Sequence, residues 1–118
     1  MAGTVLVIED DTATATLSRD VWEAEGYRVL RAVGGAGIDA ARAAHPTVIL
    51  LDMHMPGMDG AAVARRLRAD PATADLPIVC MSSALTRGGP PPGMPHDDCL
   101  PKPFAVAMLS AVVVRWAA

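Results

Sequence analysis

The stretch TVILLDMHMPGMDG, residues 47–60, is the part of the chain that most constrains its fold. Its first five residues are apolar and partly β-branched, which is typical of a strand buried on both faces of a parallel sheet. The apolar run stops at Asp52, and a Pro-Gly turn follows. A carboxylate at the tip of such a strand contributes nothing to a hydrophobic core. We therefore interpret Asp52 as a candidate functional residue.

Strand-like and helix-like segments alternate on both sides of this stretch. The first helix is expected to follow an N-cap at Thr12, and Gly34, Gly35 and Gly37 are expected to form a turn before the second helix. The alternation predicts a parallel sheet with helices on both faces, joined by right-handed crossovers. Strands are predicted at residues 4–8, 27–33, 47–51, 78–81 and 99–100, and helices at about 12–25, 38–44, 61–69 and 104–116.

Length and composition limit the classes of protein that the chain can represent. Its 118 residues predict one domain over residues 1–118, and 52% hydrophobic residues exclude a disordered chain. A net charge of −3 without a basic block argues against a nucleic-acid partner. The amino terminus lacks the features of a signal peptide, and no apolar run reaches the ~20 residues that span a bilayer. A soluble cytosolic domain is the expectation.

Polar residues follow the predicted strands at their carboxyl ends, which is where open α/β sheets bind ligands. Glu9 and Asp10 follow the first strand, Asp52 the third and Ser82 the fourth, and the last strand leads to Lys102. Lys102 is the only lysine, although the chain carries 10 basic residues in all. Close carboxylates repel each other unless a cation lies between them, and Mg²⁺ prefers such oxygen ligands. A carboxylate beside Mg²⁺ and a lysine can act as the nucleophile in phosphoryl transfer.

With these motifs in place, the chain resembles a response-regulator receiver domain, the phospho-accepting half of two-component signalling. VLVIEDD (5–11), LLDMHMPGMDG (50–60), LPIVCMSSA (76–84) and LPKPF (100–104) match the family's motifs in order. The resemblance spans essentially the whole chain. It implies an α/β, flavodoxin-like, doubly wound five-stranded parallel sheet with the strand order 2-1-3-4-5.

The resemblance also implies a role for each matching residue. Asp52 would be the phosphoacceptor, Lys102 the phosphate-binding lysine and Ser82 the switch hydroxyl. Gly60 would pack where a side chain does not fit. The ligands of Mg²⁺ would be Asp10 and Asp52 directly, Glu9 through water, and His54 through its backbone carbonyl.

The function implied is phosphorelay signalling by a regulatory domain that is not an enzyme in the usual sense. A sensor histidine kinase, a phosphotransfer protein or a small phosphodonor would phosphorylate Asp52. Two features depart from the family pattern. Cys99 stands where the family has its switch aromatic, and residues 84–98 are too rich in Gly and Pro for the expected fourth helix, which we predict to be shortened or replaced by a loop.

The last predicted helix is apolar on all sides, with Arg115 as its only charged residue. A surface helix normally has one charged face, so we expect a partner to cover this one. A second copy of the chain or an output domain would pack on Val106, Val113 and their neighbours.

Three other interpretations fit the residues less well. Residues 35–40 fit GxGxxA, so a dinucleotide-binding domain using Gly35, Gly37 and Asp52 is the main alternative. An aspartate-nucleophile phosphatase would need a second acid two residues after Asp52, where the chain has His54. A metal site at His96, Asp98 and Cys99 would match no structural zinc spacing, and neither Cys80 nor Cys99 belongs to a CxxC motif.

Overall fold

The computed structural model describes residues 3–53, 60–82, 95–101 and 105–117, with the side chains of Ser82, Pro101 and Ala117 excepted. These residues form five strands and four helices in alternation, apart from β4 and β5, which follow each other in this part of the chain. The elements are β1 Thr4–Ile8, α1 Thr12–Ala24, β2 Arg28–Ala32, α2 Ala36–Ala44, β3 Val48–Asp52, α3 Gly60–Ala69, β4 Ile78–Ser82, β5 Asp98–Pro101 and α4 Val106–Ala117.

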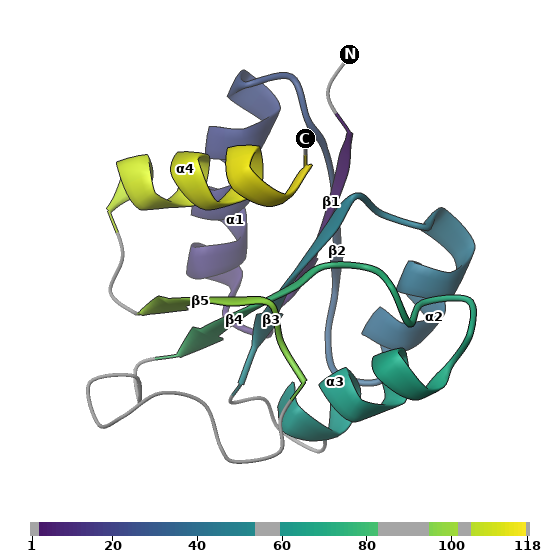
Figure 1. Cartoon of the computed structure of the whole chain (residues 1–118). Coiled ribbons are helices and arrows are strands. Elements are labelled where there is room, and N and C mark those ends of the chain that lie inside the picture. The colour runs from purple at the N-terminus through teal and green to yellow at the C-terminus, as the bar shows by residue number, and fades with distance from the viewer. Residues whose placement is uncertain (1–2, 54–59, 83–94, 102–104, 118) are drawn as a thin grey trace.

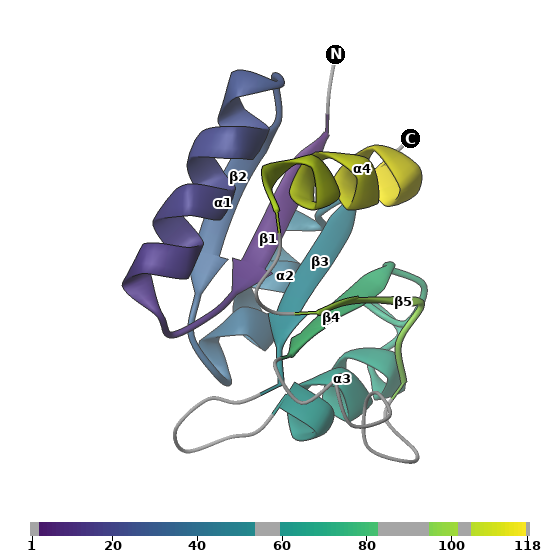
Figure 2. The same cartoon turned by 90° about the vertical axis from the view of Figure 1, so that its left-hand side faces the viewer.

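The strands form one parallel sheet in the order β2-β1-β3-β4-β5, which confirms the predicted strand order. Helices α1 and α4 cover one face of the sheet, and α2 and α3 cover the other (Figure 1). The view turned by 90° shows α1 and α4 in front of the strands (Figure 2). The carboxyl ends of all strands therefore lie at the same end of the sheet, because the strands run in the same direction.

Each face of the sheet has its own hydrophobic core. The core under α1 and α4 includes Trp22, Leu50 and Leu109, and the core under α2 and α3 includes Leu51, Ala41 and Leu67. All five residues of β3 are buried, as expected for a central strand covered on both sides. The Trp22 Nε1–H donates a hydrogen bond of 2.9 Å to the Leu109 carbonyl, which joins α1 to α4.

Local details differ from the sequence-based expectation at two helix starts. The N-cap of α1 is Asp11 and not Thr12, because the Asp11 carboxylate accepts a hydrogen bond from the Thr14 N–H at 2.9 Å. Helix α2 already begins at Ala36, so Gly37 lies inside the helix and not in a turn. A Cβ on Gly37 would come within 2.4 Å of Ile8 Cδ1, so this glycine allows α2 to approach β1 closely.

The prediction that Val113 faces a partner is wrong. Val113 is fully buried, in the core beneath α4, because it lies on the side of the helix that packs against the sheet. The large apolar residues of α4 that are exposed are instead Val106 at 54%, Met108 at 38% and Val114 at 55% exposure. The helix thus has one buried and one exposed apolar side.

Most of the Gly- and Pro-rich segment lies outside the described residues, including the place of the predicted loop or shortened helix. Within the described ranges, no helix has both the length and the apolar character required to cross a membrane.

Candidate functional site

Three carboxylates meet at the carboxyl ends of the two central strands. Ile8 of β1 pairs with Leu51 of β3, so Glu9 and Asp10 follow β1 beside Asp52, the last residue of β3. One carboxylate oxygen from each of the three residues lies within 4.8 Å of the others. The sheet register thereby brings together residues that are more than forty positions apart in the sequence.

The three carboxylates differ in their access to solvent. Glu9 is fully buried and Asp52 is 3% exposed, whereas Asp10 is the most exposed member of the group. Glu9 Oε2 accepts a hydrogen bond of 3.3 Å from the Asp11 N–H. Burying carboxylates close to one another is costly unless hydrogen bonds or a cation compensate their charges.

Gly60 lies against the backbone of the residues at the tip of β3. A Cβ at this position would come within 2.5 Å of the Asp52 carbonyl oxygen and 2.6 Å of Met53 Cα. The Gly60 N–H also donates a hydrogen bond of 3.0 Å to the Met53 carbonyl. The prediction that Gly60 packs where a side chain would not fit is confirmed, and the first turn of α3 is held directly beside Asp52.

Arg31 of β2 holds the acidic segment from the other side. Its Nε–H donates to the Glu9 carbonyl at 3.1 Å, and its Nη2 donates to the Asp10 carbonyl at 3.0 Å. The two bonds fix the backbone that carries both carboxylates. The sequence offered no signal for this contact, because it depends on the pairing of β2 with β1.

The donor set fits a hard divalent cation. Carboxylate oxygens are the preferred ligands of Mg²⁺, which binds at 2.0–2.1 Å and usually keeps several waters. The carboxylate oxygens lie within 4.8 Å of one another, and opposite ligands in such a shell are roughly 4.2 Å apart. Direct binding by one or two carboxylates, with the remaining one bound through water, therefore suits the observed spacing.

The remaining predicted site residues can be placed only in part. Ser82 is the last residue of β4 and pairs with Pro101 of β5. Asp52 pairs with Met81, so Ser82 follows immediately after the partner of Asp52. Lys102 and His54 lie outside the described residues.

The alternative of a metal site at His96, Asp98 and Cys99, which matched no zinc spacing, gains no support from the structure, because two of its members have other partners. Cys99 forms a disulfide with Cys80. The Asp98 carboxylate accepts hydrogen bonds from Trp116 Nε1 at 2.9 Å and from the Cys99 N–H at 2.8 Å. Partial burial raises the pKa of Asp98, but the Trp116 indole, the Cys99 N–H and the charge of Arg115 together lower it below its usual value.

The geometry also argues against the dinucleotide alternative. That motif needs the glycine loop and the acidic residue at the ends of neighbouring strands. Here Gly35 follows β2, Asp52 ends β3, and β1 lies between the two strands. Gly37 serves close helix packing, as its contact with Ile8 shows.

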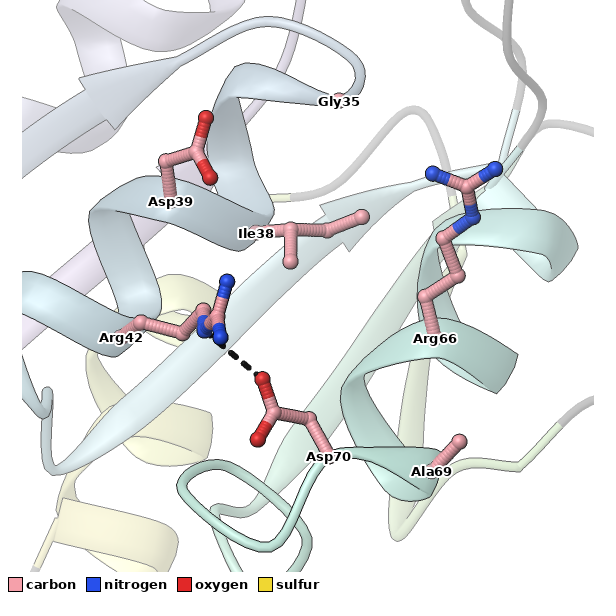
Figure 3. A pocket seen from close by; sticks show the side chains of 7 residues that line it. All are labelled: Gly35, Ile38, Asp39, Arg42, Arg66, Ala69 and Asp70. Atoms are coloured by element: carbon pink, nitrogen blue, oxygen red, sulfur yellow. Dashed lines mark ion pairs between the residues drawn. The ribbon is translucent and has the colours of Figure 1, made fainter.

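A separate groove of about 450 Å³ lies between α2 and α3 (Figure 3). Its lining includes Asp39, Arg42, Arg66 and Asp70, and none of the three clustered carboxylates. Arg42 Nε and Asp70 Oδ2 form an ion pair of 2.8 Å across the groove. This contact joins the carboxyl-terminal parts of the two helices, away from the acidic cluster.

Comparison with known proteins agrees with the fold and with the acidic cluster. Residues 5–114 match the family profile of the response regulator receiver domain. The response regulator PleD of Caulobacter vibrioides is 38% identical over 116 residues, which cover 96% of this chain and 26% of PleD. The chain thus spans about a quarter of the length of that relative. DivK of Brucella ovis, a polar-differentiation response regulator, is 32% identical over 75% of this chain and 72% of its own length.

Solved structures show the same architecture. The receiver domain of the Pseudomonas aeruginosa sensor histidine kinase PA1611, solved with a magnesium ion in its active-site cleft, superposes with a TM-score of 0.90. It is 26% identical, and the match covers 99% of this chain and 98% of that one. CheY4 of Vibrio cholerae, a chemotaxis protein at 22% identity, shares the fold with a TM-score of 0.86 over 98% of this chain and 99% of its own. With a family profile matched over nearly its full length, the chain belongs to the response regulator receiver domains of two-component signalling.

Proposed function

We propose that this chain accepts a phosphoryl group on Asp52 in a Mg²⁺-dependent step of a phosphorelay. One observation carries the proposal. Glu9, Asp10 and Asp52 place carboxylate oxygens within 4.8 Å of one another at the carboxyl ends of β1 and β3, in a chain of the receiver family. A cation between the three carboxylates would compensate the charge that they bring together in this partly buried place.

The reaction would be an in-line displacement at phosphorus. An Asp52 carboxylate oxygen attacks the phosphorus, and an Oδ–P bond forms. The bond between phosphorus and the donor breaks, and its electron pair leaves with the imidazole nitrogen of a phosphohistidine or with the leaving group of a small phosphodonor. The only lysine of the chain, Lys102, would pair with a phosphoryl oxygen as a compact point charge.

The fixed parts of the site would supply positioning. Asp10 and Asp52 would bind Mg²⁺ directly, Glu9 through water, and His54 through its backbone carbonyl. When bound, the ion would neutralise the charge that collects on the transferred phosphoryl oxygens. Arg31 and Gly60 act on the backbone: Arg31 holds the Glu9–Asp10 segment at 3.0 and 3.1 Å, and Gly60 leaves room beside Asp52.

We further propose how the signal enters and leaves this single receiver domain, residues 1–118. A histidine kinase or phosphotransfer protein in the cytoplasm would load Asp52, and Ser82 would bond the new phosphoryl group, which shifts the population of a second conformation. The exposed apolar side of α4, with Val106, Met108 and Val114, would contact a second copy or an output domain.

Intact-mass spectrometry after incubation with acetyl phosphate tests the proposal. We expect one phosphoryl adduct that requires Mg²⁺ and is absent in Asp52→Asn. Asp39→Asn is the matched control, because Asp39 is an exposed carboxylate on α2 outside the acidic cluster. An adduct that persists in Asp52→Asn, or that forms equally well in EDTA, would overturn the proposal.

A further inference from the structure

The two cysteines of the chain face each other across the β4–β5 pair. Cys80 of β4 and Cys99 of β5 are register partners in the parallel sheet, with their Cα atoms 4.6 Å apart. This separation lies within the range of about 4.4–6.8 Å that a disulfide spans, and the structure joins the two residues by a disulfide. The parallel pairing of β4 and β5 thus holds the two residues at a separation from which the bond can form.

The disulfide lies between the strands that lead to the proposed switch residues. Cys80 precedes Ser82 by two residues on β4. Cys99 precedes Pro101, the register partner of Ser82, by two residues on β5, and Lys102 follows Pro101 in the sequence. The bond therefore restrains the pair of strand ends at which phosphorylation is proposed to act.

The two cysteine residues differ in their exposure to solvent. Cys80 is fully buried in the core beneath α2 and α3. Cys99 is only partly buried, and its strand β5 lies at the edge of the sheet with β4 as its single neighbour. A reagent in solution would therefore reach Cys99 first, with Cys80 as the residue that completes the bond.

We propose that Cys80 and Cys99 form a reversible oxidation site whose disulfide opposes the phosphorylated conformation; the second half of this statement rests on the proposed function. Phosphorylation of Asp52 is proposed to change how the ends of β4 and β5 lie relative to each other, and a covalent bond between the two strands would raise the free-energy cost of that change. In the cytoplasm, where the chain is proposed to act, disulfides are usually transient or redox-sensing, which favours a reversible bond over a permanent one.

The oxidation needs an external oxidant, for which a low-molecular-weight disulfide such as oxidised glutathione is sufficient. The Cys99 thiolate attacks one sulfur of the reagent, and a first molecule of reduced glutathione leaves. The Cys80 thiolate then attacks Cys99 Sγ in the mixed disulfide, and a second molecule of reduced glutathione leaves. One protein S–S bond forms, the reagent's S–S bond is broken, and the two protons of the protein thiols end on the two glutathione molecules.

The coupling between the two sites must be reciprocal. If the disulfide disfavours the phosphorylated state, then phosphorylation must disfavour the disulfide by the same factor. The ratio of reduced to oxidised glutathione at which half of the protein is oxidised should therefore change when Asp52 is phosphorylated. Couplings between sites typically amount to a factor of about 5 or more.

The test is a titration of the whole chain in glutathione buffers, with and without phosphoramidate and Mg²⁺. Phosphoramidate is a phosphodonor that does not acylate thiols. Samples are quenched in acid and alkylated, and intact mass then gives the thiol content and the phosphoryl content of each molecule. We expect the oxidation to be reversible. We also expect that half-oxidation of the phosphorylated protein requires a ratio of reduced to oxidised glutathione about fivefold lower than for the unphosphorylated protein.

The control variants separate the two halves of the proposal. Asp52→Asn should oxidise normally but show no shift of the midpoint, and Cys99→Ala should phosphorylate normally without forming any protein disulfide. A bond that fails to form, or that cannot be reduced in the native protein, overturns the oxidation site whether or not Asp52 reacts. An unchanged midpoint in molecules that carry the phosphoryl group overturns the coupling. If no phosphoryl adduct appears, the proposed function and the coupling both fall, while the titration without phosphoramidate still decides the oxidation site.

Discussion

The two regions of the sheet that carry the proposed chemistry are held in different ways. The carboxylates at the ends of β1 and β3 stand on strands covered by helices on both faces, and their backbone is fixed by Arg31 and Gly60. The β4–β5 pair lies at the edge of the sheet and is joined by the Cys80–Cys99 disulfide. The acidic region thus depends on packing and hydrogen bonds, whereas the edge depends in addition on one covalent bond, for which we propose reversible oxidation.

This difference assigns separate tasks to the two regions. Catalytic groups work best when rigid elements hold them in place, since small displacements weaken phosphoryl transfer. A switch instead needs an element with two accessible arrangements. The central strands suit the first task and the edge pair suits the second.

The largest expected effect concerns α4, whose core includes residues of both strands of the edge pair, and compares two adjacent residues of this helix. Val113→Glu places a carboxylate in the core beside Leu100 and Met81, so we expect a loss of roughly 3–5 kcal/mol or an unfolded protein. Val114→Glu, at a position that is 55% exposed, should remain folded. Circular dichroism with urea titration measures both.

The same pair of variants tests the proposed partner surface. In sedimentation velocity at high concentration, Val114→Glu should reduce any self-association of the phosphorylated chain. Self-association of Val114→Glu as strong as that of the wild type would contradict the proposed surface, and equal stability of the two variants would contradict the burial of Val113.

Gly60→Ala tests how tightly the acidic region is packed. The new Cβ would lie 2.5 Å from the Asp52 carbonyl oxygen, so we expect a loss of about 1–3 kcal/mol from overpacking and slower phosphorylation of Asp52. Gly34→Ala is the control, because its positive φ of 57° makes alanine unfavourable while no atom lies within 4 Å of the new Cβ. If both variants phosphorylate at the same rate, then the contact of Gly60 with β3 does not position Asp52.

Arg31→Lys sharpens the account of the same region, because it keeps the charge but loses the fork that binds two carbonyls. Mutation of residues that orient metal ligands typically lowers metal affinity by about tenfold or more. We therefore expect isothermal titration calorimetry to show an affinity for Mg²⁺ that is lower by about tenfold. Arg28→Lys on the same strand is the matched control. Identical Mg²⁺ affinity in the two variants would show that Arg31 stabilises the loop but does not position the ligands of Mg²⁺.

Asp98→Asn should have the smallest effect, and it concerns the edge. The lowered pKa of Asp98 means that its carboxylate stabilises the fold above the unfolded pKa of about 4, and that this contribution is lost as pH falls below it. We expect the variant to lose about 1 kcal/mol or less at pH 7, with the difference from wild type closing toward pH 3. A difference that stays constant over this range would contradict the assigned role of the charge.

Prediction from sequence succeeded for features that depend on local sequence pattern, such as the position of a buried strand. The apolar runs ending in Ile8 and Leu51 placed β1 and β3 within one residue, and their shared direction brought Glu9 and Asp10 to Asp52. The misses depend on spatial pairing. Arg31 contacts Glu9 and Asp10 through the β1–β2 register, and Cys80 meets Cys99 only because β4 and β5 pair in one particular register.

The error at Val113 has a different origin. In a helix rich in alanine and valine, the buried and exposed sides have similar side chains, so hydrophobic periodicity does not identify the inner face. Packing against Leu100 and the other residues beneath α4 decides it. Two successive valines thus have opposite environments, with Val113 buried and Val114 exposed.

Chemical trapping of the phosphorylated residue tests the central claim most directly. Borohydride reduces an aspartyl phosphate to homoserine, which marks the acceptor permanently for peptide mapping. After treatment with acetyl phosphate and Mg²⁺, we predict homoserine at position 52 alone, and none when EDTA replaces Mg²⁺. Homoserine at Asp10 or at any other aspartate, with Asp52 unmodified, would contradict the account.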